Sequence, residues 1–125
     1  MPQTRIVFYQ ELDGGVPARV WLVHLKAKNL KAWAVCLERM KLLRDLGHEL
    51  RRPAADFLRD GIYELRAKQG HVQYRLLYFF HGRNLVVVAH GLTKEDQVPE
   101  VEIARALKRK RLFEAKPETH TYAED

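Results

Sequence analysis

The chain has 125 residues, enough for one hydrophobic core and too few for two comfortable ones. Its 22 Lys and Arg exceed its 16 Asp and Glu, and the formal net charge of +6 favours a polyanionic partner such as nucleic acid or an acidic protein. Cys36 is the single cysteine, which excludes an intramolecular disulfide and a Cys-based zinc cluster and suits a reducing environment. The first residues lack a signal pattern and no run of about 18 apolar residues occurs, so we expect a soluble, cytoplasmic protein with no membrane partner.

The first half of the chain is predicted to hold one strand and two helices. Residues 5–9 form a short β-rich run that ends in a turn with two glycines. Pro17 suits the first position of a short helix, and Asn29 could cap a second helix for which Gly47 stands just past the end. Four apolar side chains at helical spacing on this second helix are expected in the core: Leu30, Trp33, Leu37 and Met40.

Three strands follow one another in the centre of the chain with almost no connecting residues. The apolar runs at 62–66, 72–80 and 85–92 are separated by short Gly-containing breaks of the kind that close hairpins. We therefore expect an antiparallel meander, joined by the 5–9 strand, with helices packed on one face. Residues 48–53 are read as a basic, irregular connection, and residues 53–58 lead into the meander.

The C-terminal part is predicted to hold one helix and a tail. Pro99 marks the first turn of a helix that runs to about Phe113, with acidic residues at its start. Its end forms a basic patch at positions 105, 108, 109, 110 and 111. Residues 114–125 are polar and lack an apolar period, so we expect a poorly ordered tail after a single α+β domain of residues 1–113. The expected order is strand, helix, helix, three-stranded meander and helix.

Arg75 is the residue that most needs an explanation, because it lies mid-strand among apolar residues. A buried cation costs desolvation unless it meets water, a carboxylate or an anionic ligand. The meander brings Arg66, Arg75 and Lys94 to one sheet surface, which makes a candidate anion site. The alternative is that Arg66 pairs with Glu64 or Asp60 and that Lys94 is a solvated loop residue.

Other chemistries find no support in the residues. The chain shows no Gly-rich phosphate loop, no Ser-His-Asp order and no metal-spaced His pair, so we expect neither a metal nor another cofactor. The six histidines are scattered, and for His90, at the end of an apolar strand, we favour a satisfied core side chain over a catalyst.

Four segments together carry a resemblance to a known family. They are residues 60–66 (Asp-Gly-Ile-Tyr-Glu-Leu-Arg), 74–78 (Tyr-Arg-Leu-Leu-Tyr), 90–94 (His-Gly-Leu-Thr-Lys) and 99–106 (Pro-Glu-Val-Glu-Ile-Ala-Arg-Ala). With the order of elements, they make residues 5 to about 113 resemble the RelE/HigB superfamily of bacterial toxins, and more narrowly its phage-derived Gp49-like, HigB branch.

This resemblance implies a RelE-like fold and a toxin of a type II toxin-antitoxin system. Such a toxin is a metal-independent endoribonuclease that cleaves messenger RNA on the ribosome, inhibits translation and growth, and is neutralised by an antitoxin that usually has a helix-turn-helix domain. We expect the neutralising segment to be acidic or amphipathic, because the patch from Arg105 to Arg111 is cationic. The alternative within the fold is a non-cleaving relative that binds a protein target, as the gyrase-inhibiting ParE proteins do, and a third is a basic domain whose arginines only pair with carboxylates.

The resemblance also implies roles for individual residues. Arg75 would be the central phosphate contact, Lys94 a second cation and Arg66 a third. Some relatives carry two lysines in the strand equivalent to residues 62–66 and a tyrosine at the last helix, whereas this chain has Ile62, Glu64 and Val101. The general base is therefore left open between Glu64, a histidine such as His90, and catalysis by charge alone. Three cations of the last helix are candidates for binding RNA: Arg105, Lys108 and Arg109.

Overall fold

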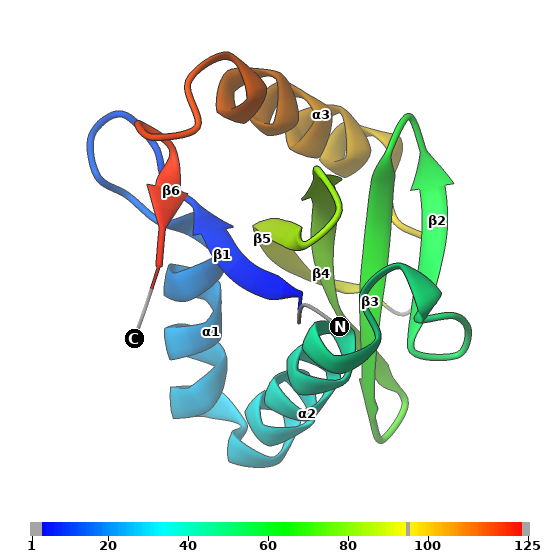
Figure 1. The fold of residues 1–125 in the computed structure, drawn as a ribbon. Helices are drawn as coiled ribbons and strands as arrows, with labels where there is room; N and C mark the ends of the chain where they lie inside the picture. The colour runs from blue at the N-terminus through cyan, green and yellow to red at the C-terminus, as the bar shows by residue number, and fades with distance from the viewer. Residues whose placement is uncertain (1–3, 95, 124–125) are drawn as a thin grey trace.

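The computed structural model describes residues 4–94 and 96–123, and it confirms the α+β class. The strands are β1 (Arg5–Tyr9), β2 (Ala55–Arg59), β3 (Ile62–Gln69), β4 (Val72–His81), β5 (Leu85–Lys94) and β6 (Thr121–Tyr122). The helices are α1 (Pro17–Lys28), α2 (Leu30–Leu46) and α3 (Glu100–Ala115), and the 3-10 turn η1 (Gly47–Glu49) follows α2 (Figure 1). No described helix is long and apolar enough to cross a membrane.

The sheet has the order β2-β3-β4-β5-β1-β6 and is mixed. Strands β3, β4 and β5 form the predicted antiparallel meander, and β1 joins it parallel to β5. No strand was expected in residues 53–58, which lead into the meander, but residues 55–59 add β2 antiparallel to β3. This short run contains two charged residues and no clear alternation, so its strand conformation depends on pairing with β3 rather than on its own pattern.

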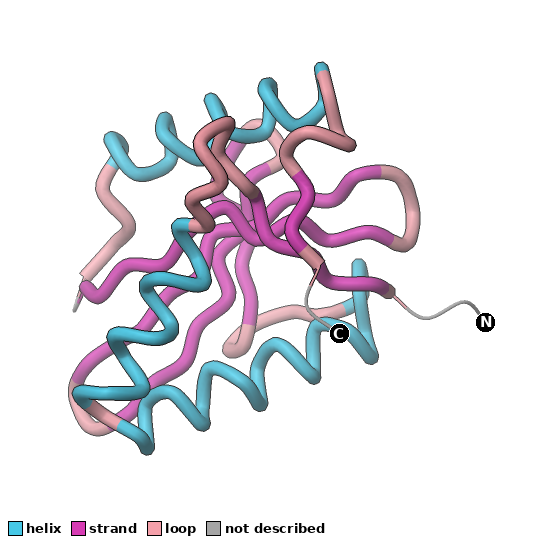
Figure 2. Tube along the Cα trace, turned by 90° about the vertical axis from the view of Figure 1, so that its left-hand side faces the viewer, coloured by secondary structure: helices cyan, strands magenta, loops and turns pink. Residues whose placement is uncertain are grey.

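Helices cover both faces of the sheet, so the expectation of helices on one face was wrong. Helices α1 and α2 pack on one face and α3 on the other, as Figure 2 shows. The physical reason lies in β4, where Leu76 and Tyr78 belong to the α1–α2 core while Leu77 and Phe79 belong to the α3 core. A strand that is apolar on both sides must be covered on both sides.

The predicted helix boundaries agree with the structure. Helix α1 begins at Pro17. The Asn29 side chain caps α2 by accepting a hydrogen bond from the backbone N–H of Ala32 at 3.1 Å. Gly47 ends α2 with a φ of 55°, a left-handed conformation that favours glycine.

The expected core stripe of α2 was wrong. Leu30 is 62% exposed and Leu37 is 39% exposed, while Trp33 and Met40 are half-buried. A neighbouring stripe, made of Ala32, Cys36 and Leu43, is buried instead. Small side chains at two of these positions let the helix lie close to the sheet, and the larger residues are left at its margin. Burial raises the pKa of the Cys36 thiol to about 12, so this cysteine serves packing rather than nucleophilic chemistry.

The segment expected to be a poorly ordered tail has a defined structure up to residue 123. Helix α3 continues to Ala115, and β6 then pairs antiparallel with β1. His120 is buried, its ring stacks on Tyr9 at 5.1 Å between centroids, and its Nδ1 donates to the Gln10 carbonyl at 2.7 Å. Composition alone could not reveal this pairing, because its partner lies more than a hundred residues earlier in the chain.

Candidate functional site

Strand register places the two strand arginines side by side. Arg66 on β3 is the cross-strand partner of Arg75 on β4, on the face covered by α3. Both donate to one carboxylate oxygen, Glu64 Oε1: Arg66 through Nε at 2.8 Å, and Arg75 through Nη1. The structure therefore brings together three of the four predicted catalytic residues, and Arg66 pairs with Glu64 as the alternative reading expected.

Two further residues extend this group toward the edge of the sheet. Asp56 on β2 lies 3.4 Å from Arg66 Nη2 and 3.0 Å from Arg52 Nη2, and the hydrogen bond from Arg52 holds the pKa of the Asp56 carboxyl below its usual range. We call these five residues the arginine cluster: Arg52, Asp56, Glu64, Arg66 and Arg75. Three arginines against two carboxylates give the cluster a net charge of +1.

The cluster is buried at one end and open at the other. The side chains of Arg75 and Glu64 are only 7% and 3% exposed, and Arg75 Nη2 donates to the carbonyl of Asp96. Arg75 Nε is also buried and has no hydrogen-bond partner among the described residues. In contrast, the Arg66 side chain is 29% exposed and that of Arg52 is 75% exposed. A ligand can therefore approach through Arg66 and Arg52.

Lys94, the fourth predicted catalytic residue, ends β5. Its backbone pairs with Gln73, two residues from Arg75 along β4. Its side chain lies outside the described part of the structure, so its predicted role as a second cation stays a prediction.

An aromatic pocket adjoins the open end of the arginine cluster. It has a volume of about 650 Å³ and shares Arg52 and Asp56 with the cluster. Arg51 also lines it, together with Phe57, which is 53% exposed and packs edge-on against Tyr63 at 5.2 Å. The sequence analysis did not predict this pocket. The usable signal was the consecutive pair Arg51 and Arg52 close in the chain to Phe57.

His90 lies on the same face but under α3. A register shift opposite Leu77 and Tyr78 lets both Ala89 and His90 face α3. Arg109 Nη1 donates to His90 Nδ1 at 2.7 Å, and because arginine can only donate, His90 must carry its proton on Nε2, which donates to Glu102 at 3.1 Å. Burial, followed by the charge of Arg109, lowers the pKa of His90 to about 4. His90 is thus the satisfied, neutral core side chain that the sequence favoured.

The three predicted RNA-binding residues of α3 differ in their exposure. Arg109 is 17% exposed and is held by Glu11 at 3.3 Å as well as by His90. Arg105 is 50% exposed, although it donates to Glu102 at 2.7 Å, and Lys108 is exposed. Only Arg105 and Lys108 face solvent, and their role toward RNA stays a prediction. No three His, Cys, Asp or Glu side chains among the described residues lie together in a way that could hold a metal ion.

Comparison with known proteins identifies the class and then the family. The chain has an α+β fold with a mixed six-stranded sheet among its described residues. The model of the phage-derived Gp49-like protein family matches residues 21–111, and the chain belongs to this family. The matched range contains the whole arginine cluster and His90 but not β1 or β6. No curated protein matches the chain.

Proposed function

We propose that this protein is the toxin of a type II toxin-antitoxin system and that it acts as a ribosome-dependent endoribonuclease on messenger RNA, without a metal or other cofactor. A cognate antitoxin, with a helix-turn-helix domain, neutralises it. One observation carries the proposal: the arginine cluster has an excess of positive charge, and its open end adjoins an aromatic pocket. Membership of a family associated with toxin-antitoxin systems supports it.

The chemistry of RNA cleavage matches this arrangement. Attack of a 2′-OH on the adjacent phosphate forms a 2′,3′-cyclic phosphate as the bond to the 5′ oxygen breaks, the 2′-OH losing a proton and the leaving 5′ oxygen gaining one. Extra negative charge develops on the phosphoryl oxygens in the transition state, and fixed cations stabilise that charge. Arg66 and Arg52 are the cluster residues that a phosphate can reach directly. Arg75 and Glu64 lie beneath them, and a direct contact with the phosphate requires the hydrogen bond from Arg75 to the Asp96 carbonyl to open. Lys94 would supply a further cation at the end of β5.

The aromatic pocket adds a place for a base. Exposed aromatic rings stack on bases of any sequence, and arginines contribute both charge and planar stacking. Phe57 and Tyr63 lie on the α1–α2 face of the sheet, whereas Arg66 lies on the α3 face. With the phosphate at Arg66, the RNA would pass around the β2 edge, past Arg52, to place a neighbouring base against Phe57. A pure protein binder does not require this combination.

The test replaces Arg66 with Ala, because Arg66 is partly exposed and Glu64 keeps its bond to Arg75 in the variant. Each protein is induced in cells that lack the antitoxin, growth is followed, and transcript ends are mapped; cleavage is also measured with purified ribosomes. We expect the cleavage rate to fall by roughly a hundred- to a thousandfold, as for the loss of one transition-state donor. The matched control is Arg83→Ala, in the exposed turn between β4 and β5, which should keep full activity.

The outcomes separate the alternatives. Full cleavage by a folded Arg66→Ala protein would show that the arginine cluster is not the active site. Growth inhibition by the parent protein without any new transcript ends would instead support a non-cleaving inhibitor that binds a protein target such as gyrase.

A further inference from the structure

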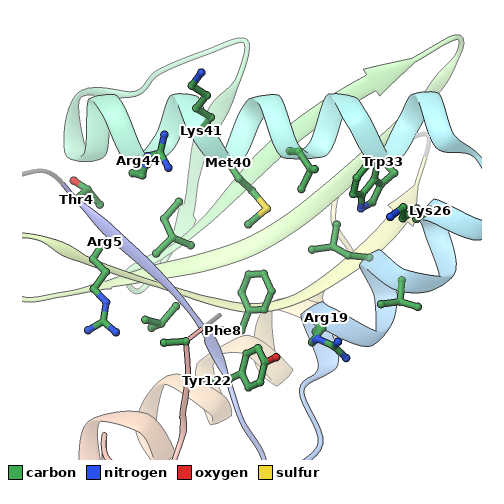
Figure 3. A pocket seen from close by; sticks show the side chains of 16 residues that line it. Thr4, Arg5, Phe8, Arg19, Lys26, Trp33, Met40, Lys41, Arg44 and Tyr122 are labelled. Atoms are coloured by element: carbon green, nitrogen blue, oxygen red, sulfur yellow. The ribbon is translucent and has the colours of Figure 1, made fainter. Parts of the chain in front are cut away.

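A second concave surface lies on the opposite face of the sheet from the arginine cluster. It is a groove of about 900 Å³ between β1, α1 and α2, and β6 lines one end of it (Figure 3). None of its lining residues belongs to the arginine cluster or to the aromatic pocket. The groove therefore needs an explanation of its own.

The floor of the groove is apolar and partly open to solvent. Met40 points from α2 toward Phe8 of β1, and Trp33 lies beside Lys26 of α1 (Figure 3). Leu22 also lines the floor. Leu37, at 39% exposure, also lines it, and so does Val23 at 51%. Trp33, Leu37 and Met40 are three of the four α2 side chains whose burial the sequence predicted, and here they line a surface that a partner could cover.

The rim of the groove is cationic. Five basic residues line it, from all three main elements: Arg5, Arg19, Lys26, Lys41 and Arg44. No Asp or Glu occurs among the described residues that line the groove. An apolar floor inside a rim of one charge sign is complementary to an amphipathic ligand of the opposite sign.

Two of these cations, Lys26 and Arg44, have weaker contacts than the cations on the other face. Arg44 lies 3.8 Å from Asp45, its neighbour in the chain, and both side chains are about half exposed. The Lys26 ammonium lies over the Trp33 ring at 4.6 Å, and no described carboxylate pairs with it. Solvent-exposed cations of this kind can exchange water for a partner's carboxylates at little cost.

The chemistry of the floor favours a polypeptide over RNA. RNA binding would need open aromatic faces for stacking. Lys26 covers one face of Trp33, and Tyr122 packs against Phe8 at 6.4 Å and under Arg19 at 5.9 Å. The remaining surface consists of aliphatic and thioether side chains, which suit the apolar side chains of a peptide.

We propose that the groove between β1, α1 and α2 binds an acidic, amphipathic segment of a partner protein, with the apolar side of the segment on the Trp33 and Met40 floor and its carboxylates at the basic rim. This inference does not depend on RNA cleavage. The antitoxin proposed above would carry such a segment, and only this assignment of the carrier rests on the proposed function.

The test measures binding of a defined probe to the purified full chain. The probe is a synthetic helical peptide with leucines along one face and glutamates on both flanks, and two control peptides replace either the leucines with serine or the glutamates with glutamine. The protein carries 5-fluorotryptophan, so that ¹⁹F NMR reports Trp33 in the groove and Trp21, which packs against Tyr74 outside it, as an internal control. We expect the probe to shift the Trp33 resonance and not that of Trp21, and both control peptides to bind about tenfold more weakly or worse.

Charge-reversal variants of the protein test whether the probe binds at the groove. Lys26→Glu/Arg44→Glu, at two places on the rim, should weaken binding of the labelled probe by about tenfold or more. The matched control is Lys68→Glu/Lys116→Glu, at two exposed lysines outside the groove, the arginine cluster and the basic patch of α3, which changes the net charge equally and should leave binding within about twofold. Thermal melting confirms that both variants fold.

Three results would overturn the proposal. Equal weakening by the two double variants would show that only net charge attracts the probe. Tighter binding of single-stranded oligouridine than of the peptide, with a Trp33 shift, would identify the groove as a nucleic-acid site. A Trp33 shift that grows with protein concentration in the absence of peptide would identify it as a contact between copies of this chain.

Discussion

The cations on the two faces of the sheet have opposite surroundings. Under α3, the side chains of Arg75 and Arg109 are 7% and 17% exposed, and each meets a carboxylate. Around the groove on the other face, Lys26 is exposed and Arg44 is about half exposed, and their neighbours are apolar or weakly paired.

Burial causes this difference. A desolvated arginine needs a partner charge and hydrogen bonds to be stable, whereas an exposed lysine or arginine is satisfied by water. The formal net charge of +6 is therefore not equally accessible on the two faces. A cation count from the sequence cannot separate arginines that hold the fold together from those that can meet a partner.

The largest expected effect comes from removing one partner of the buried Arg75–Glu64 pair. Arg75→Ala leaves Glu64 buried with one arginine fewer, and removing one member of a buried pair costs about 3 to 5 kcal/mol of the free energy of unfolding. That is a large part of the total for a domain of this size. Urea unfolding of Arg75→Ala and of Arg75→Met/Glu64→Leu measures this loss. The double variant should lose less free energy of unfolding, because it removes both charges of the pair. A single variant as stable as the parent would show that the pair contributes nothing to folding.

The next effect compares the core with the groove on one helix. Leu43→Ala should cost about 2 to 5 kcal/mol, because Leu43 is fully buried between α2 and the sheet. Trp33→Ala should cost only about 1 to 2 kcal/mol, less than a truncation in a core, because Trp33 is half-buried at the groove. Chemical unfolding of both variants gives the order, and the reverse order would place Trp33 in the core after all.

Helix α2 shows which features of the fold the sequence predicts and which it does not. The Asn29 cap and the Gly47 end of α2 are local signals, and both agree with the structure. The rotation of α2 about its axis is not local, because apolar residues occur on more than one stripe and contact with the sheet decides which stripe is buried. Two of the three fully buried residues of α2 are the small Ala32 and Cys36, which carry little weight in a hydrophobic pattern.

The candidate site also combines features that the sequence predicts with features that it does not. The adjacency of Arg66 and Arg75 followed from the meander, because short turns fix the register of neighbouring strands. The carboxylate of Asp56 and the aromatic pocket did not follow, because they depend on β2, whose strand conformation the sequence did not indicate. The hydrogen bond from Arg75 to the Asp96 carbonyl could not be predicted either, because it depends on tertiary structure alone.

The third effect depends on pH and comes from His90. Its pKa is about 4 in the folded chain and near 6.5 when unfolded, so the unfolded chain binds more protons between these values and stability falls as the pH drops from 6.5 toward 4. Between about pH 7 and pH 5 the loss should be about 2 kcal/mol. Glu102, Arg105 and Arg109 are the charged groups that set this pKa.

His90→Gln provides the control for that pH dependence. The glutamine amide can accept from Arg109 and donate to Glu102 without titrating. Unfolding free energies of the two proteins, measured across this pH range, should differ in slope below pH 6.5 and run parallel above it. Identical slopes would show that His90 is not the group responsible.

The smallest effect is expected when one arginine is removed from each face of the sheet in turn, which compares the two faces directly. Arg44→Ala at the groove should change the free energy of unfolding by less than about 0.5 kcal/mol, since the side chain is 48% exposed and its contact with Asp45 is long. Arg109→Ala on α3 should cost about 1.5 to 3 kcal/mol, because it leaves His90 Nδ1 without a donor and removes a partner of Glu11. Thermal and urea unfolding at matched ionic strength compare the two. Equal losses would contradict the division of the cations into structural and accessible sets, whereas the expected inequality means that Arg44 remains available to an acidic partner without any cost to the fold.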